Sequence, residues 1–303
     1  MRNAVCSALL SLFGRHPFVF LTGDLGFQAL EPLREVMGEK FINAGISEQN
    51  MISVAAGLAQ QGMMAWTYSI GSFGYARPFE QIRNDVCLQS LPVKLVGNGG
   101  GYAYGAMGPS HHALEDYGVL LTLPGMRVYV PIFGKDVQPI VEGMAVATTP
   151  GYLRLGRCEC PPGYTVPPYA PWRRLLAGRG TPTLVVGPVA GSLLAACLAL
   201  ELDVRPDIWG VTELPVRSSE MPAEFLAMVR QHRCLCVVEE HVAHGGVGQM
   251  VAHGLLTMGV SMDTLLHAHA HGYPSATCGS QSFHRRESAL DAPSILRLLG
   301  LGS

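Results

Sequence analysis

The chain has few charged residues and no long apolar run. Charged residues make up 15% of its 303 residues, and lysine occurs only at three positions (Lys40, Lys94 and Lys135). A net charge of −2 without a basic stripe argues against a nucleic-acid partner, which would need clustered Lys and Arg. No apolar run approaches the ~20 residues that cross a bilayer, so we expect no membrane contact and a cytoplasmic protein. The N-terminal segment lacks a small-residue cleavage site, and we expect an amphipathic helix there.

Metal-binding patterns are also absent. The eight cysteines lack zinc spacing, and we expect free, buried thiols in a reducing compartment. The segment HAHAH alternates as a strand does, which would put His267, His269 and His271 on one face. A metal site is one interpretation of that row, but a solvated strand edge is the favoured one. We therefore predict no metal ligands in this chain.

What the sequence does contain is apolar residues, at 48% of the chain. Short apolar runs alternate with helical stretches, which predicts parallel sheets covered on both faces. A proline-dense segment separates two such patterns. The expected fold is α/β, with two doubly wound parallel-sheet domains at residues 1–160 and 179–303 and a linker at 161–178. So apolar a composition also fits a chain that buries part of its surface against a partner.

The segment FINAGISEQNMISVAAGLAQQG, residues 41–62, is the most informative one. It places the carboxylate of Glu48 at the start of an apolar helix that we expect to be buried on most sides. Gly45 and Gly57 flank it, where a backbone or ring can approach closely. From the residues alone, a helix-start residue is the favoured interpretation of Glu48.

Five further segments occur along the chain in the order found in transketolases, which this chain resembles over nearly its whole length. They are TGDLG (22–26), SIGSFGYARPFEQIR (69–83), GPSHHALEDYGVLLTLPGMRVYVP (108–131), GYLRLGR (151–157) and EEHVAHGGVGQMVA (239–252). The resemblance implies a pyrimidine-binding domain for thiamine diphosphate followed by the transketolase C-terminal domain.

One family motif is missing. A complete transketolase begins with a diphosphate-binding domain that carries Gly-Asp-Gly followed by Asn, and here the nearest string is Gly23-Asp24-Leu25. The resemblance therefore implies the second half of a split enzyme. This chain would bind only the pyrimidine end of the cofactor. A partner subunit would hold the diphosphate and its Mg²⁺ or Ca²⁺, in an α₂β₂ assembly acting on a small sugar substrate.

The resemblance also assigns cofactor-binding residues. Glu48 matches the glutamate that hydrogen-bonds the aminopyrimidine and activates the cofactor. Phe73 and Ile70 match positions against which the ring stacks, and Asp24 and Leu25 lie in the family's strand-end turn. Arg77 matches an arginine that supports this segment, while Phe79 fits a core residue better.

Substrate contacts follow in the same way. His111 matches the catalytic histidine of the Gly-Pro-Thr-His motif, with His112, Glu115 and Asp116 as weaker neighbours. Arg157 and Arg2 match phosphate-binding arginines, and Gln28 aligns with a phosphate-binding serine. Gly99 and Met107 replace a histidine and an aspartate that contact sugar hydroxyls, so the expected substrate differs from an ordinary pentose phosphate.

Three other interpretations remain open at this stage. One is the beta subunit of a 2-oxo acid dehydrogenase-like or other thiamine diphosphate acyl or ketol transferase. Another is the synthase that makes deoxyxylulose phosphate, which is usually one long chain. The third is a non-catalytic scaffold, against which Glu48 and His111 argue.

Overall fold

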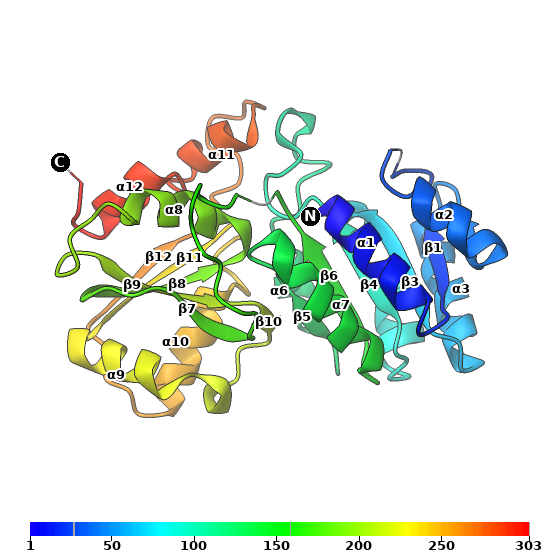
Figure 1. Cartoon of the computed structure of the whole chain (residues 1–303), viewed down its shortest axis with the longest axis horizontal. Helices are drawn as coiled ribbons and strands as arrows, with labels where there is room; N and C mark the ends of the chain where they lie inside the picture. The colour runs from blue at the N-terminus through cyan, green and yellow to red at the C-terminus, as the bar shows by residue number, and fades with distance from the viewer. Residues whose placement is uncertain (27, 158, 303) are drawn as a thin grey trace.

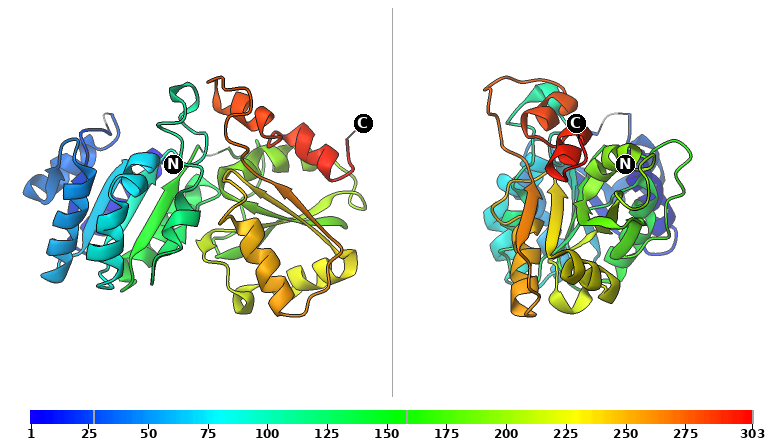
Figure 2. Two further views of the ribbon diagram at one scale, coloured as in Figure 1. Left: turned by 180° about the vertical axis from the view of Figure 1, so that it is seen from behind. Right: turned by 90° about the vertical axis from the view of Figure 1, so that its left-hand side faces the viewer.

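The computed structural model describes residues 1–26, 28–157 and 159–302. They form two lobes side by side, each with one sheet and helices on both faces (Figure 1). The first half of the chain, blue to green, forms one lobe, and the second half, yellow to red, forms most of the other. The view from behind in Figure 2 shows the same two layered lobes, with the last helices lying over the second sheet.

The first sheet has the strand order β10-β5-β6-β4-β3-β1-β2. Its strands are β1 (Val19–Thr22), β2 (Phe41–Asn43), β3 (Ala65–Ile70), β4 (Lys94–Asn98), β5 (Arg127–Tyr129), β6 (Gly151–Leu155) and β10 (Glu213–Leu214). Neighbours are parallel except β10, which is antiparallel to β5. Because β10 comes from the second half of the chain, it ties the two halves together.

The helices of the first lobe cover both faces of this sheet. They are α1 (Arg2–Phe13), α2 (Glu31–Met37), η1 (Gly38–Lys40), α3 (Glu48–Gln60), α4 (Gly71–Ala76), α5 (Phe79–Gln81), η2 (Ile82–Cys87), η3 (Gly105–Met107), α6 (Asp116–Leu120), η4 (Gly134–Asp136) and α7 (Val137–Val146). Leu9 and Val141, from α1 and α7, share a core with Trp66 of β3. Ile52 of α3 packs with Leu21 on the opposite face.

The second sheet has the order β12-β11-β8-β9-β7. Its strands are β7 (Trp172–Leu176), β8 (Gly180–Val186), β9 (Pro206–Val211), β11 (Cys234–Glu239) and β12 (Thr264–Ala268). The helices around it are η5 (Gly187–Val189), α8 (Ala190–Cys197), η6 (Ser218–Glu220), α9 (Ala223–His232), α10 (Val247–Thr257), α11 (Gln281–Glu287) and α12 (Ala292–Leu298). Along β11, Leu235 and Val237 enter one core while Cys236 and Val238 enter the other, as the period of two requires.

The α/β fold with two sheets is confirmed, with local corrections. The edge strands β7 and β10 are antiparallel to their neighbours, so neither sheet is wholly parallel. The residues expected as linker, 161–178, include β7. The charged residues Arg173 and Arg174 interrupt the apolar pattern of β7, so the sequence did not indicate a strand here. In the structure they pair with Asp136 and Asp207, respectively. The domain limits themselves stay a prediction.

Two burial expectations were partly wrong. Helix α3 buries only one face, and Val54 is 39% exposed because it points away from the sheet. The seven described cysteines form no disulfide; Cys160 and Cys278 are exposed, and Cys158 lies outside the described residues. Within the described residues, no helix is long and apolar enough to cross a membrane.

The row of histidines is confirmed as a cluster but extends past the strand. Only His267 lies in β12, and the rings of His267, His269 and His271 follow one another at centroid distances of 4.8 Å. His267 Nε2 hydrogen-bonds the buried Glu239 carboxylate at 2.7 Å. That bond gives the row a structural partner in the core.

Candidate functional site

The candidate residues gather at the carboxyl ends of the strands in the first sheet, where ligands bind in such folds. Asp24 follows β1, Ile70 ends β3, and Asn98 ends β4. Arg157 follows β6, which neighbours β4. Parallel pairing therefore brings segments from distant parts of the sequence to one edge of the sheet.

Glu48 is the first residue of α3. The chain enters the helix through Gly45, whose φ of +72° favours glycine. Glu48 is only 5% exposed, and its Oε2 accepts a hydrogen bond from Arg77 Nη1 at 2.9 Å. The positive end of the helix dipole also favours a carboxylate here. The site thus contains a nearly buried carboxylate with a single cationic partner among the described residues.

Phe73 lies beside this pair. Its ring, on α4, has the guanidinium carbon of Arg77 3.9 Å from its centroid. The ring of His111 meets Phe73 edge-on at 5.0 Å, and the ring of Tyr104 lies 5.7 Å from His111. The rings of Phe73, His111 and Tyr104 therefore form a continuous row, and Arg77 connects its Phe73 end to Glu48.

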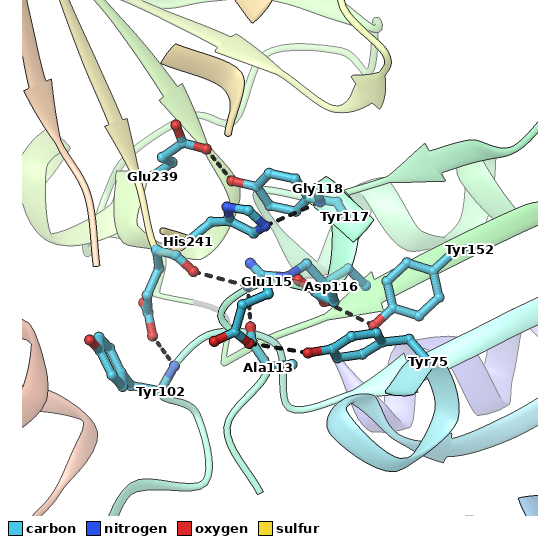
Figure 3. Close-up of polar contacts among 12 residues, drawn as sticks. Tyr75, Tyr102, Ala113, Glu115, Asp116, Tyr117, Gly118, Tyr152, Glu239 and His241 are labelled. Atoms are coloured by element: carbon cyan, nitrogen blue, oxygen red, sulfur yellow. Dashed lines mark hydrogen bonds and ion pairs between the residues drawn. The ribbon is translucent and has the colours of Figure 1, made fainter. Parts of the chain in front are cut away.

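The loop that carries His111 is anchored by buried charges. The Arg154 guanidinium donates to the Asp116 carboxylate and to the carbonyl oxygens of Ala113 and Glu240. Tyr152 donates to Asp116, as Figure 3 shows. Closer to the histidine, Ser72 Oγ donates to the Ser110 carbonyl at 2.9 Å. Side chains from β6 and α4 together therefore hold the loop that carries His111 in position.

The second lobe also holds this region. Tyr117 donates a hydrogen bond to Glu239, and Gly118 N donates to His241 Nε2 (Figure 3). Burial raises the pKa of Glu239, but the hydrogen bond to His267 and its other partners lower it overall. Burial also lowers the pKa of His241. The resulting network joins an ionised carboxylate and a neutral imidazole across the lobes.

His112 points away from His111 into this contact between the lobes. Its Nε2 bonds the Gly105 carbonyl oxygen, so it carries the proton, and its Nδ1 accepts from Tyr273 OH at 2.8 Å. Burial, with His284 nearby, lowers the pKa of His112 to about 4. His112 is therefore a neutral structural residue that joins η3 to the second lobe.

Arg2 and Arg157 lie on one cavity of about 360 Å³, together with Asn98, Gly99 and Tyr104. Within the described chain, no carboxylate oxygen lies within 4 Å of either guanidinium. The cavity is therefore suited to an anion, for which the arginine fork is a good partner.

Tyr104 is the residue here that sequence reasoning missed. A Cβ built on Gly99 would come within 2.0 Å of the Tyr104 ring, so this ring fills the space beside Gly99. Its hydroxyl accepts from Asn98 Nδ2 at 2.9 Å. A tyrosine within a glycine-rich loop gives no motif, and only the folded loop shows its position.

Gln28 and Asp24 lie elsewhere. The described lining of the arginine cavity does not include Gln28, whose backbone N–H donates to Glu31. Asp24 and Leu25 line a separate cavity of about 170 Å³ beside β1 and β2, where Asp24 accepts from Asn43. The structure therefore does not bring Gln28 to the arginines.

The residues present fit one end of thiamine diphosphate. The Arg77 guanidinium, a flat group with N–H donors, lies on the Phe73 ring and hydrogen-bonds Glu48, so the same two side chains suit a flat ring with a hydrogen-bonding nitrogen. For the metal ion at the diphosphate end, the described residues offer no comparable set. Among the described residues, no group of three or more His, Cys, Asp or Glu is arranged to hold a metal ion.

Comparison with known proteins agrees with this geometry. Residues 1–162 match the family "Transketolase, pyrimidine binding domain". One subunit of the "Apulose-4-phosphate transketolase" of Phocaeicola vulgatus is 28% identical over 265 residues, 82% of this chain and 83% of that protein. The "1-deoxy-D-xylulose-5-phosphate synthase 2" of Geobacter sulfurreducens is 32% identical over 90% of this chain, which spans only 43% of that protein.

A solved structure is similar over almost the whole fold. The protein described as "Split gene transketolase, inactive beta4 tetramer" superposes with a TM-score of 0.81 at 27% identity. The match covers 99% of this chain and 96% of that one. The two-lobed arrangement seen here is thus also that of the split-gene protein.

Proposed function

The chain belongs to the transketolase family, and we propose that it is the beta-type subunit of a two-chain enzyme that transfers a two-carbon ketol unit between sugar phosphates. The observation that carries this proposal is the nearly buried Glu48 carboxylate, whose hydrogen-bond partner Arg77 also lies on the face of Phe73. A scaffold protein would have no need to keep a carboxylate nearly buried, because burying a charge is costly.

Thiamine diphosphate, when bound, supplies a nucleophilic carbon for the ketose carbonyl. Glu48 would hold a proton at N1′ of its aminopyrimidine, which promotes the tautomer that removes the proton from that carbon. Phe73 and Ile70 would give the ring an apolar wall. Asp24 and Leu25 remain candidate contacts at the neighbouring strand end.

The substrate would lie between His111 and the arginine cavity. His111 would hydrogen-bond the substrate hydroxyls, and Arg2 and Arg157 would bind its phosphate. Tyr104 lies between these groups, 5.7 Å from the His111 ring, and lines the same cavity. We add it as a substrate contact and give Gln28 less weight, since Gln28 is not among the described residues that line this cavity.

The other end of the cofactor would come from a second chain. We propose a diphosphate-binding partner subunit that supplies the Mg²⁺ or Ca²⁺ ligands in an α₂β₂ assembly. Light scattering on the active mixture tests this composition. A one-to-one heterodimer that retains full activity would contradict it.

The Glu48→Gln variant tests the proposal in the assembled enzyme. The amide keeps the shape but cannot supply the acidic proton, so exchange of the thiazolium C2 proton with D₂O should be lost while assembly persists. Glu80→Gln, which changes an exposed glutamate nearby, is the matched control. Wild-type turnover by Glu48→Gln would return Glu48 to the role of a helix-start residue.

A further inference from the structure

Arg77 occupies the part of the site that the proposed function reserves for the cofactor ring. Its guanidinium carbon lies 3.9 Å from the centroid of Phe73, and Nη1 donates to Glu48 Oε2 at 2.9 Å. These two side chains are the carboxylate and the aromatic face on which the proposed function depends. We call Glu48 and Phe73 the pyrimidine cradle.

The two occupants compete because they use the same surfaces. A guanidinium is flat and delocalised, carries N–H donors in its plane, and stacks on aromatic rings. An aminopyrimidine is also flat and would hydrogen-bond the same carboxylate. At 3.9 Å the guanidinium is at stacking distance, which leaves no room for a second flat group between it and Phe73. The His111 ring already approaches Phe73 edge-on at 5.0 Å.

Few contacts hold the Arg77 side chain in the pyrimidine cradle. Its side chain is 45% exposed, and its hydrogen bond to Glu48 is the only one it makes to the described residues. By contrast, Arg154 is 3% exposed and makes hydrogen bonds to three different residues. Rotation of Arg77 into solvent would therefore break one ion pair and one stack.

We propose that Arg77 is a placeholder for the cofactor's pyrimidine ring. In the subunit without cofactor, it neutralises the nearly buried Glu48 carboxylate and keeps the Phe73 ring covered. Cofactor binding displaces it. This inference rests on the proposed function of Glu48. It makes Arg77 a competitor of the cofactor, because the pyrimidine ring can bind only the fraction of molecules in which Arg77 has left the cradle.

The test uses 4-amino-5-hydroxymethyl-2-methylpyrimidine, which lacks the diphosphate and so depends little on the partner subunit or metal. Its dissociation constant is measured by ligand-observed NMR with the full chain, alone and in the assembled enzyme. Arg77→Gln should bind it about tenfold more tightly than the wild type, since the competitor is gone. Arg83→Gln, which changes an exposed arginine on the same segment, should bind it as the wild type does.

A second measurement covers the case in which Arg77→Gln folds poorly. In Arg77→Ala, methylguanidinium should enter the emptied cradle and compete with the pyrimidine, whereas methylammonium at the same ionic strength should not. If the role of Arg77 were merely structural, methylguanidinium would not be expected to compete with the pyrimidine in Arg77→Ala.

The outcomes separate the two proposals. Equal or weaker pyrimidine binding by Arg77→Gln, with measurable binding by the wild type, would overturn the placeholder and leave the cofactor site intact. No binding by any variant, alone or in the assembled enzyme, would overturn both.

Discussion

At the scale of single residues, the environment of Glu48 determines what it can do. The carboxylate is 5% exposed at the start of α3 and needs a partner, because burying a lone charge is costly. In this structure the partner is Arg77, across 2.9 Å. A cofactor nitrogen could replace that partner, since the Glu48 carboxyl group can accept from the guanidinium N–H and, when protonated, can donate its O–H to a ring nitrogen.

His111 provides a residue-scale prediction that differs from that of Glu48. His111→Ala in the assembled enzyme should keep C2 proton exchange, because Glu48 is untouched, while turnover falls by about 10²–10³-fold through the loss of a hydrogen-bonding group at the substrate. The measurement is exchange by NMR beside steady-state kinetics. Loss of exchange in His111→Ala would show that the histidine acts on the cofactor.

Some residues of the site could be predicted from the sequence and others could not. Glu48, Phe73 and His111 lie in segments with recognisable order, and the structure brings them together. Tyr104 was not predictable, because its place beside Gly99 depends on how the glycine-rich loop turns. Arg77 was expected as a support, and its contact with both Glu48 and Phe73 appears only in three dimensions.

At the scale of elements, the loop between η3 and α6 depends on the buried pair of Arg154 and Asp116. Their side chains are 4% and 0% exposed. Removing one member of such a pair leaves an uncompensated charge in the core. The loop carries His111, so its anchor affects both stability and the site.

Arg154→Met should therefore lower the free energy of unfolding by about 3–5 kcal/mol, measured by urea denaturation. Asp116→Asn in the same chain should recover part of the loss. Arg179→Met, which breaks the exposed pair with Asp203, should change stability by less than about 1 kcal/mol. Equal effects from Arg154→Met and Arg179→Met would show that the buried pair is not an anchor.

His112 links the same loop to the second lobe and predicts a pH dependence. Its pKa is lowered by burial to about 4 from an ordinary value of 6.5. Between these values the unfolded chain binds more protons than the folded chain, so stability is present above pH 6.5 and lost as the pH falls toward 4. The loss is up to about 3 kcal/mol.

The His112→Gln variant isolates this contribution. Glutamine retains a donor for the Gly105 carbonyl and an acceptor for Tyr273 but does not titrate. Its free energy of unfolding, measured in urea between pH 4 and 7, should fall less steeply with acid than that of the wild type. Parallel pH profiles for the two proteins would contradict the assignment.

The elements themselves were predicted well where apolar periodicity was strong. Strands β1, β3, β4, β6, β8, β9 and β11 and helices α3, α7 and α9 correspond to the short apolar runs and helical stretches that alternate along the sequence. Short edge strands such as β10 (Glu213–Leu214) could not be predicted, because two residues show no period. This strand is defined only by its pairing with β5. The exposed face of α3 was also missed, since alanine and valine give little contrast between its faces.

At the scale of the whole molecule, the proposed function makes this chain one half of a cofactor site. The first lobe offers a cradle for a flat ring and, beside it, a cavity with two arginines. The described residues show no metal-binding cluster for a diphosphate. The second lobe packs on the histidine loop through Glu240, which accepts from Tyr102 N at 2.6 Å, and so stabilises the site without completing it.

The most direct test of the split-enzyme account is a calorimetric titration of thiamine diphosphate with Mg²⁺ into this chain alone and into its mixture with the diphosphate-binding partner. Diphosphate and metal contribute most of the charge-assisted binding. We predict that the lone chain binds at least about 100-fold more weakly than the mixture, with little dependence on Mg²⁺. Tight, magnesium-dependent binding to the lone chain would contradict the account.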